Sequence, residues 1–160
     1  MKLESINRNK YKGDYEATIL EQWKTCVEAA NGVTEKRNNS NNIYITINTA
    51  LFAVITFSFD YKSILLSLIG IVISILWINS INSYKKLNSV KYSIINEIER
   101  KLPLAPFAYE WDKLCNERKY IRLTKIEKIL PGLFIGLYSF SILWPIIKTL
   151  LRQLCSCIGG

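Results

Sequence analysis

Residues 43–83 read IYITINTALFAVITFSF, then DYK, then SILLSLIGIVISILWINSINS. The two long blocks, 43–59 and 63–83, contain no charged residue and are 17 and 21 residues long. At a rise of about 1.5 Å per residue, helices of these lengths can cross the hydrocarbon core of a bilayer, the first of them only just. Three residues between them leave room for little more than a tight turn, so we expect an antiparallel pair of membrane-spanning helices.

A third uncharged block, ILPGLFIGLYSFSILWPII at residues 129–147, is 19 residues long and can also span a membrane. Pro131 and Pro145 near its ends, together with the amphipathic tail at 148–160, leave a re-entrant or interfacial segment as the alternative. The three blocks predict an all-α integral membrane protein with three transmembrane helices, organised as a single membrane domain over residues 1–160.

Positive charge sets the direction in which these helices cross. Seven Lys or Arg lie in residues 1–42 and eleven in residues 84–128, whereas the 60–62 turn has one and the 148–160 tail has two. The positive-inside rule therefore places the N-terminus and residues 84–128 in the cytoplasm. A net charge of +8 is also typical of nucleic-acid-binding proteins. Since the basic residues flank the apolar blocks, we assign them to anionic lipid headgroups and expect no nucleic-acid partner.

The residue types that common catalytic and metal sites require are missing or scattered. The chain has no His, which excludes His-containing triads, His-ligated zinc and imidazole acid–base catalysis. Its four Cys form neither a CxxC pair nor a zinc-ribbon pattern, so we expect no metal and no cofactor. An intramembrane enzyme would need a catalytic pair, and for Glu127, the carboxylate beside the third block, a salt bridge or a helix cap is the simpler role. We therefore expect no enzymatic activity, and we assign no role to Cys155, Cys157 or the terminal Gly159-Gly160.

Two cytoplasmic helices are expected to extend the first two spans. Asp14 can cap a helix over residues 14–42 that places Ile19, Trp23, Val27 and Ala30 on one face, with a weak point at Asn31-Gly32. After the second span, an amphipathic face is formed by Leu87, Val90, Ile94, Ile98 and Leu102. We expect the two helices to pack as a coiled-coil-like stalk that ends at Pro103 and Pro106, followed by one or two short helices within 84–128.

Each apolar block carries small or polar residues at the spacing of one helix face. In the first block these are Asn42, Thr46, Thr49, Ala53 and Thr56; in the second, Ser63, Ser67, Gly70 and Ser74; in the third, Gly132, Gly136 and Ser139. Small residues allow transmembrane helices to approach closely, and we expect this packing role for the second and third sets. For Asn42, Thr46, Thr49 and Thr56 two interpretations stay open: helix packing, or the lining of a narrow uncharged pore formed by several copies.

Asn48 lies on a different face of the first block from these residues. A side-chain amide in lipid needs a hydrogen-bond partner, so we expect Asn48 to bond across a helix interface. None of the three blocks contains Asp, Glu, Lys or Arg. Proton-relay transporters and voltage sensors depend on such intramembrane charges, so both classes are disfavoured.

Two segments resemble a known family. Tyr15–Leu51, with its EQWK, a basic TEKRNNSN and an INTAL entry to the membrane, is similar to the RipA-family octameric membrane proteins of bacteria. LTKIEKILPGLF, at Leu123–Phe134, resembles the Leu-Thr-x-x-Glu-x-x-x-Pro pattern at that family's last span. The resemblance covers roughly residues 15–147. It implies a homo-oligomer in the bacterial inner membrane, with eight subunits suggested by the family name, and it implies no catalytic residues.

The residues and the resemblance lead to two functional hypotheses. The first is a ring-like homo-oligomer in the cytoplasmic membrane that acts as a pore or a membrane scaffold. The second is a non-conducting membrane protein whose basic cytoplasmic part docks another protein, as effectors of bacterial stress or antiviral defence do. Besides copies of itself, the expected partners are membrane lipids and, under the second hypothesis, a cytoplasmic protein.

Overall fold

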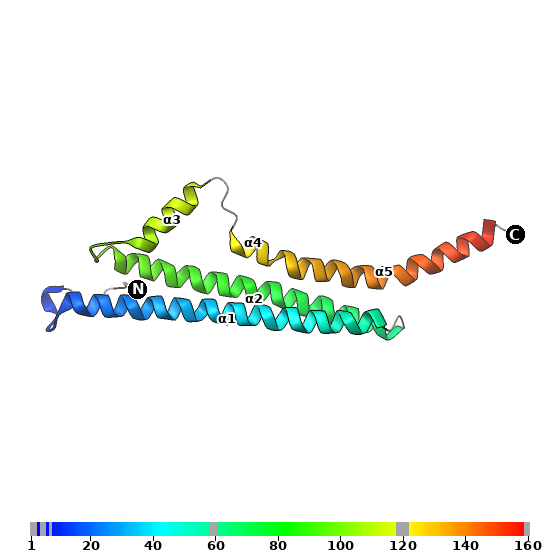
Figure 1. The fold of residues 1–160 in the computed structure, drawn as a ribbon, viewed down its shortest axis with the longest axis horizontal. Coiled ribbons are helices and arrows are strands. Elements are labelled where there is room, and N and C mark those ends of the chain that lie inside the picture. Colours follow the sequence, from blue (N-terminus) through cyan, green and yellow to red (C-terminus); the bar gives the residue numbers. More distant parts are fainter. Residues whose placement is uncertain (1–2, 4–5, 7, 58–60, 118–121, 159–160) are drawn as a thin grey trace. The chain divides into compact units, whose positions relative to one another are not determined.

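The computed structural model describes residues 3, 6, 8–57, 61–117 and 122–158, with the side chains of 57, 61–62 and 149–158 not described. After a short 3-10 turn, η1 (Arg8–Lys10), the chain forms α1 (Tyr15–Phe57), α2 (Tyr61–Glu99), α3 (Pro106–Asn116), α4 (Leu123–Glu127) and α5 (Ile129–Ile158) (Figure 1). The described residues contain no strand, which confirms the all-α prediction.

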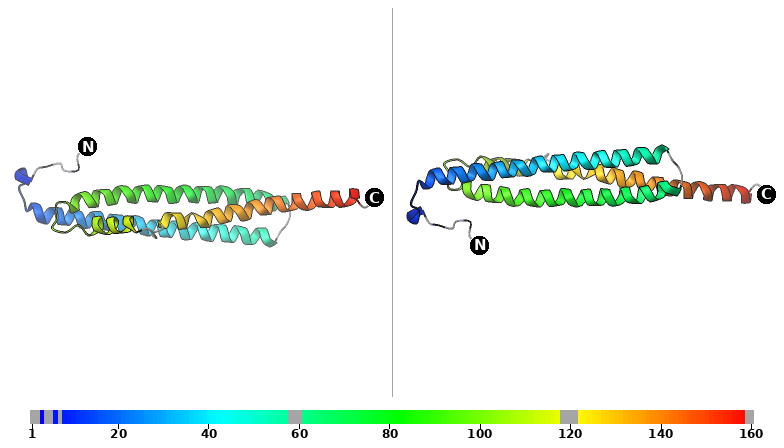
Figure 2. Two further views of the ribbon diagram at one scale, coloured as in Figure 1. Left: turned by 90° about the horizontal axis from the view of Figure 1, so that it is seen from above. Right: turned by 90° about the horizontal axis from the view of Figure 1, so that it is seen from below.

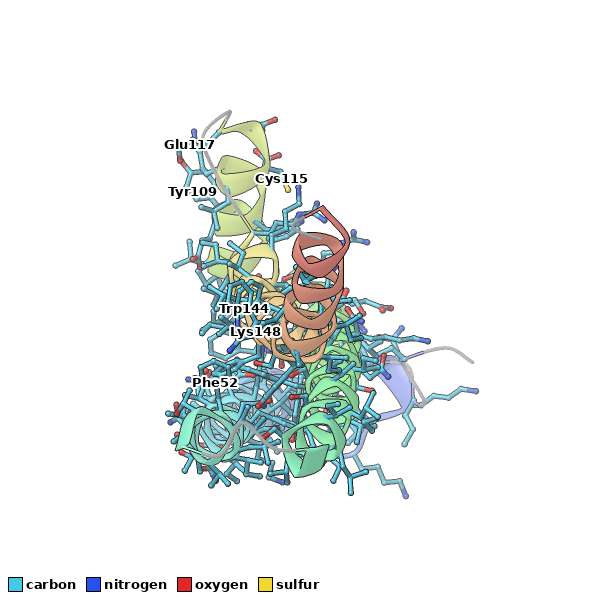
Figure 3. The ribbon with its side chains drawn as sticks, turned by 90° about the vertical axis from the view of Figure 1, so that its right-hand side faces the viewer. Phe52, Tyr109, Cys115, Glu117, Trp144 and Lys148 are labelled. Carbon is cyan, nitrogen blue, oxygen red and sulfur yellow. The ribbon has the colours of Figure 1, made fainter. Side chains whose placement is uncertain are left out.

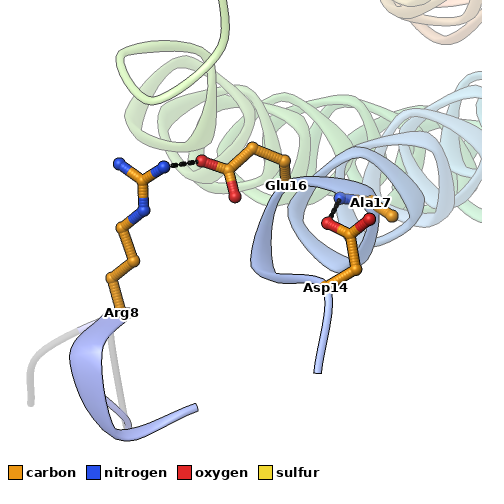
Figure 4. Close-up of polar contacts among 4 residues, drawn as sticks. All are labelled: Arg8, Asp14, Glu16 and Ala17. Atoms are coloured by element: carbon orange, nitrogen blue, oxygen red, sulfur yellow. Dashed lines mark hydrogen bonds and ion pairs between the residues drawn. The ribbon is translucent and has the colours of Figure 1, made fainter. Parts of the chain in front are cut away.

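Helix α1 begins at a capping carboxylate. Oδ1 of Asp14 accepts a hydrogen bond from the backbone N–H of Ala17 at 3.0 Å, which satisfies a donor that the first turn would leave open. Beside this cap, the guanidinium of Arg8 forms an ion pair with Glu16 in the first turn (Figure 4). The helix then continues without interruption to Phe57, so the weak point expected at Asn31-Gly32 does not break it.

Helix α2 ends at Glu99, three residues earlier than the sequence suggested. The N–H groups of Lys101 and Leu102 bond to the carbonyls of Ile98 and Glu99, at 2.9 and 3.0 Å, and these three-residue spacings close the helix in a tight turn. Pro103 explains the early end, because the residue before a proline is pushed out of the helical region. Leu102 therefore lies outside the helix in which we had placed it.

The segment after α2 contains two short helices, as expected. Pro106 was predicted to end a helix, but it starts α3 instead, at a position where a missing N–H costs nothing. Helix α5 runs past Ile147, where the third span was predicted to end, and continues to Ile158 with Pro145 inside it. Residues 58–60 of the predicted hairpin turn and Gly159-Gly160 lie outside the described residues, as do the side chains of Cys155 and Cys157.

The chain divides into two compact units. The first unit comprises residues 1–38 and 83–122, and the second comprises 39–82 and 123–160. In the second unit, portions of α1, α2 and α5 enclose a core of Ile55, Trp77, Ile81, Phe134 and Tyr138. Figure 2 shows these three helices from two further directions.

In the first unit, α1 and α2 contact each other as the stalk prediction required, through a face of α2 that overlaps the predicted one in part. Ile19 and Ala30 of α1 are buried as expected, and Trp23 and Val27 are half-buried. Of the predicted α2 face, Ile98 is buried and Ile94 and Leu102 are half-buried, whereas Leu87 and Val90 are exposed. Ile95 and Glu99, which lie beside that face, are fully buried. Polar residues can lie on the packed face of α2 because they have hydrogen-bond partners there. For example, the side-chain amide of Asn88 donates to the hydroxyl of Thr34 on α1 at 3.2 Å. The face of α2 predicted from apolar residues alone is therefore rotated by about a quarter-turn around the helix from the face that packs against α1.

Candidate functional site

A polar contact joins α1 to α2 inside the second unit. The side-chain amide of Asn48 donates to the carbonyl of Tyr44 in its own helix at 2.8 Å. Its Oδ1 accepts the hydroxyl proton of Ser74 on α2 at 3.0 Å. Both Asn48 and Ser74 are fully buried. The structure thus gives Asn48 the interhelical role that its position in an apolar block predicted, because a buried amide must satisfy both its donor and its acceptor.

The same asparagine also holds α5. The hydroxyl of Tyr138 is hydrogen-bonded to the backbone oxygen of Asn48 at 3.0 Å and to its Oδ1 at 3.1 Å. Tyr138 is completely buried, with its ring stacked on Phe134 and in edge contact with Phe52. Three helices therefore meet at one side chain. Sequence reasoning missed Tyr138, although a tyrosine in the middle of an apolar block was a usable signal, since its hydroxyl needs a partner when buried.

The predicted packing residues of α2 are buried, and one of them, Gly70, lies against Tyr138. Ser63, Ser67, Gly70 and Ser74 are all buried. A Cβ added at Gly70 would overlap the ring of Tyr138, so the absence of a side chain forms the socket for that ring. These residues line the face that α2 turns towards the interior of its own unit.

The small residues of α5 have a different surrounding. Gly132 and Gly136 are exposed, and a Cβ added at either one would meet nothing within 4 Å. Ser139 is half-buried. The buried face of α5 instead carries Pro131, Phe134 and Tyr138. Among the described residues, no side chain packs against the two glycines.

The outer surface of α1 in the second unit has two chemically different flanks. All members of the predicted polar stripe are exposed: Asn42, Thr46, Thr49, Ala53 and Thr56. Ile43, Ile47 and Val54 form a second, aliphatic flank, which is exposed as well. At about 100° per residue, this flank lies beside the polar stripe on the surface of α1. In the part of the chain that the structure describes, the polar flank is therefore open rather than covered by another helix.

Two hydroxyls of this polar flank are bonded within the helix. Thr46 donates to the carbonyl of Asn42 at 2.9 Å, and Thr56 donates to the carbonyl of Ala53 at 2.7 Å. Each hydroxyl has a single proton, so its remaining hydrogen-bonding capacity is as an acceptor. At Thr46 and Thr56 the polar flank of α1 therefore presents oxygen lone pairs together with methyl groups, and at Asn42 it presents an amide that can both donate and accept.

The first unit contains a second buried polar contact, between the end of α2 and the start of α3. The carboxylate of Glu99 accepts hydrogen bonds from the N–H groups of Phe107 and Ala108 at 3.3 and 3.1 Å. No side chain of α3 caps its own N-terminus, so Glu99 supplies the cap and its charge complements the helix dipole. The ring of Phe107 contacts both Trp23 and Tyr92, which fixes α3 to the stalk helices.

Other chemical features of the described residues are few. No group of three His, Cys, Asp or Glu side chains in this part of the chain could hold a metal ion. Glu127 closes α4 and is half-buried. An open cavity of about 550 Å³ in the first unit is lined mainly by apolar side chains, among them Ile19, Leu20 and Leu102.

Comparison with protein families adds a decisive observation. The family model described as "Octameric membrane protein family (8xMP)" matches residues 20–147, about four fifths of the chain. The chain belongs to the octameric membrane protein family. No match was found among curated proteins or among solved structures.

The described helices fit membership of the octameric membrane protein family. Ser63–Glu99 and Leu123–Lys148 are long and apolar enough to cross a membrane, and only 28% and 11% of their most apolar windows are buried. A core helix of a soluble protein would bury most of such a window, whereas these apolar side chains face outwards. This is the distribution expected where lipid is part of the solvent.

Proposed function

We propose that this member of the octameric membrane protein family is a homo-oligomeric, channel-like assembly of the bacterial cytoplasmic membrane, without enzymatic activity. Each subunit crosses the membrane three times, with residues 43–59 as the first span and the N-terminus in the cytoplasm. The family name supports self-association, and the RipA-like segments favour the same architecture. The observation that carries the proposal is the exposure of Asn42, Thr46, Thr49 and Thr56 on one flank of α1.

Lipid is an unfavourable environment for this flank. The side-chain amide of Asn42 would lose its hydrogen bonds to water near the hydrocarbon region, at a cost of about 1–3 kcal/mol for an unpaired group. The neighbouring flank, with Ile43, Ile47 and Val54, is well suited to lipid or to an apolar neighbour. Copies arranged around an axis solve both requirements, because the polar flanks then face a shared aqueous path and the aliphatic flanks face outwards.

The proposal is tested on the purified full chain. Particle images and native mass spectrometry give the number of subunits, and single-channel recording in planar bilayers gives conduction. We expect discrete conductance steps that decrease in Thr46→Val/Thr49→Val, which removes hydroxyls at nearly constant volume. Ile47→Val is the matched control on the aliphatic flank and should conduct like the parent. An assembly with no axial opening and no conductance would refute the channel and leave the membrane scaffold as the role of the oligomer.

A non-conducting partner protein is the second candidate, and one surface favours it. Leu104, Tyr109 and Trp111, in and before α3, are 79%, 65% and 49% exposed, which is unusual for large apolar side chains that water surrounds. Figure 3 shows Tyr109 on α3, near Cys115 and Glu117. If this surface binds a cytoplasmic protein, Tyr109→Ala/Trp111→Ala should abolish capture of that protein and leave assembly unchanged.

A further inference from the structure

Helix α2 carries an exposed apolar strip within the first unit. Leu87 and Val90 are exposed and Ile94, one turn further along, is half-buried; these three residues are called the α2 strip. Residues 83–96 contain three Lys and no Asp or Glu. Lys86, beside the strip, is exposed and forms no ion pair with any of the described residues. A surface with an apolar centre and a charged edge is typical of a contact between proteins.

Helix α3 exposes a surface of matching size and opposite charge. Tyr109 and Trp111 are exposed, and so are the carboxylates of Glu110 and Asp112; these four residues are called the α3 surface. Residues 106–117 contain three acidic residues and one Lys, whose ammonium lies over the ring of Tyr109 at 5.3 Å from its centroid. Charges of opposite sign steer two surfaces together and fix their register. The acidic, aromatic α3 surface is therefore complementary to the basic, aliphatic α2 strip.

The α2 strip and the α3 surface do not cover each other within one chain. Phe107 of α3 contacts Tyr92 of α2, with the ring centroids 5.7 Å apart. Val90 is two residues before Tyr92 and lies about 200° away from it around the helix. Helix α3 thus packs on one side of α2, and the strip lies on the other. Two complementary surfaces on different sides of a subunit make a head-to-tail contact, which can repeat around a closed ring.

We propose that the α3 surface of one subunit docks on the α2 strip of the neighbouring subunit. The occupant is a second copy of this chain, because the family is described as octameric and because the two surfaces match in apolar character and in charge. The inference rests on the homo-oligomer proposed above and names the surfaces of the first unit that join its subunits. Tyr109 and Trp111 supply the buried apolar area, and Asp112 and Lys86 lie at the polar edge of the contact.

Cross-linking between two differently tagged copies of the full chain, coexpressed and purified together, tests the contact. All four native cysteines are replaced by Ser in both copies. One copy carries Asn116→Cys, which lies on the same side of α3 as Tyr109, and the other carries Val90→Cys on the α2 strip. We expect a short bismaleimide to join the two tags. Lys85→Cys, at an exposed position about 140° from Val90 around α2, is the matched control and should not be joined.

An exchange of charges gives a second measurement that needs no introduced cysteine. Asp112→Lys and Lys86→Glu each place like charges at the contact. Each alone should weaken the association of subunits by about twofold to fivefold, the effect expected from exposed ion pairs. The two changes combined restore opposite charges and should return the association to that of the parent. Native mass spectrometry over a dilution series measures it, and Lys36→Glu, at an exposed position of α1, is the control.

The outcomes separate this contact from the function on which it rests. An assembly in which the two tags are never joined, or in which the exchanged charges do not restore association, would overturn the contact and leave the homo-oligomer intact. Capture of a cytoplasmic protein by the α3 surface, with assembly and cross-linking unchanged in Tyr109→Ala/Trp111→Ala, would overturn it in favour of the second candidate function. A protein that remains monomeric at every concentration would refute the homo-oligomer itself.

Discussion

Tyr138 on α5 donates its hydroxyl proton to the oxygens of Asn48 on α1, 90 residues away in the sequence, at 3.0 and 3.1 Å. Oδ1 of Asn48 also accepts from Ser74, so one amide oxygen receives bonds from two other helices. If this hydrogen bond were lost in an apolar environment, no solvent molecule could replace it. The contact therefore helps to hold α1, α2 and α5 together in their unit.

Replacing Tyr138 by Phe removes the bond and keeps the ring. We expect a loss of unfolding free energy of about 0.6–1.7 kcal/mol, the range measured for hydrogen bonds between transmembrane helices. Denaturation of the detergent-solubilised protein measures it. Tyr109→Phe makes the same chemical change at an exposed position and should have no effect. Equal stabilities for Tyr138→Phe and the parent would show that the bond contributes nothing.

Gly70 and Gly32 should respond in opposite ways to substitution by Ala. At Gly70 the new Cβ would overlap the ring of Tyr138, and overpacking of a core typically costs about 1–3 kcal/mol. At Gly32 nothing lies within 4 Å, so Ala should stabilise the long helix by about 0.5–1 kcal/mol. Thermal unfolding of both variants tests the pair, and a stabilised Gly70→Ala would contradict the socket.

Glu99→Ala should release the N-terminus of α3. The N–H groups of Phe107 and Ala108 would lose their acceptor, and the loss of a helix cap typically costs about 1 kcal/mol. Hydrogen exchange measures the effect directly, because these two amides should exchange faster while amides near Asn48 do not change. Glu97→Ala, an exposed carboxylate two residues earlier on α2, is the control. Similar exchange in both variants would mean that Glu99 does not hold α3.

Asp14→Ala should fray the first turn of α1. The N–H of Ala17 would lose its acceptor, with an expected cost of about 1 kcal/mol. Asp14→Asn keeps an acceptor oxygen at the cap and should restore most of the stability. Exchange at the Ala17 amide distinguishes the variants, and unchanged protection in Asp14→Ala would show that other contacts hold this end of the helix.

The sequence alone determined the helices of this protein and the chemistry of their faces. Uncharged blocks of 17, 21 and 19 residues predicted helices, because a backbone in lipid must satisfy its polar groups internally. The described residues of all three blocks lie in helices, and those within Ser63–Glu99 and Leu123–Lys148 are long and apolar enough to cross a membrane. Asp14 as a cap, Asn48 as an interhelical residue and the polar stripe of α1 followed from local rules of the same kind.

Only the tertiary structure decided which face meets which partner. Spacing gave α2 and α5 similar stripes of small residues, yet the stripe of α2 is buried, with Gly70 against Tyr138, and the glycines of α5 are exposed. Of the predicted apolar face of α2, Ile98 is buried but Leu87 and Val90 are exposed. Glu99 and Asn88 share the packed side instead, because α3 and α1 supply their hydrogen-bond partners. The spacing of residues along a helix shows that a polar or small face exists. Which helix packs against that face depends on residues far away in the sequence. For this reason the hydrogen-bond partners of Asn48 and the exposure of Thr49 could be learned only from the tertiary structure.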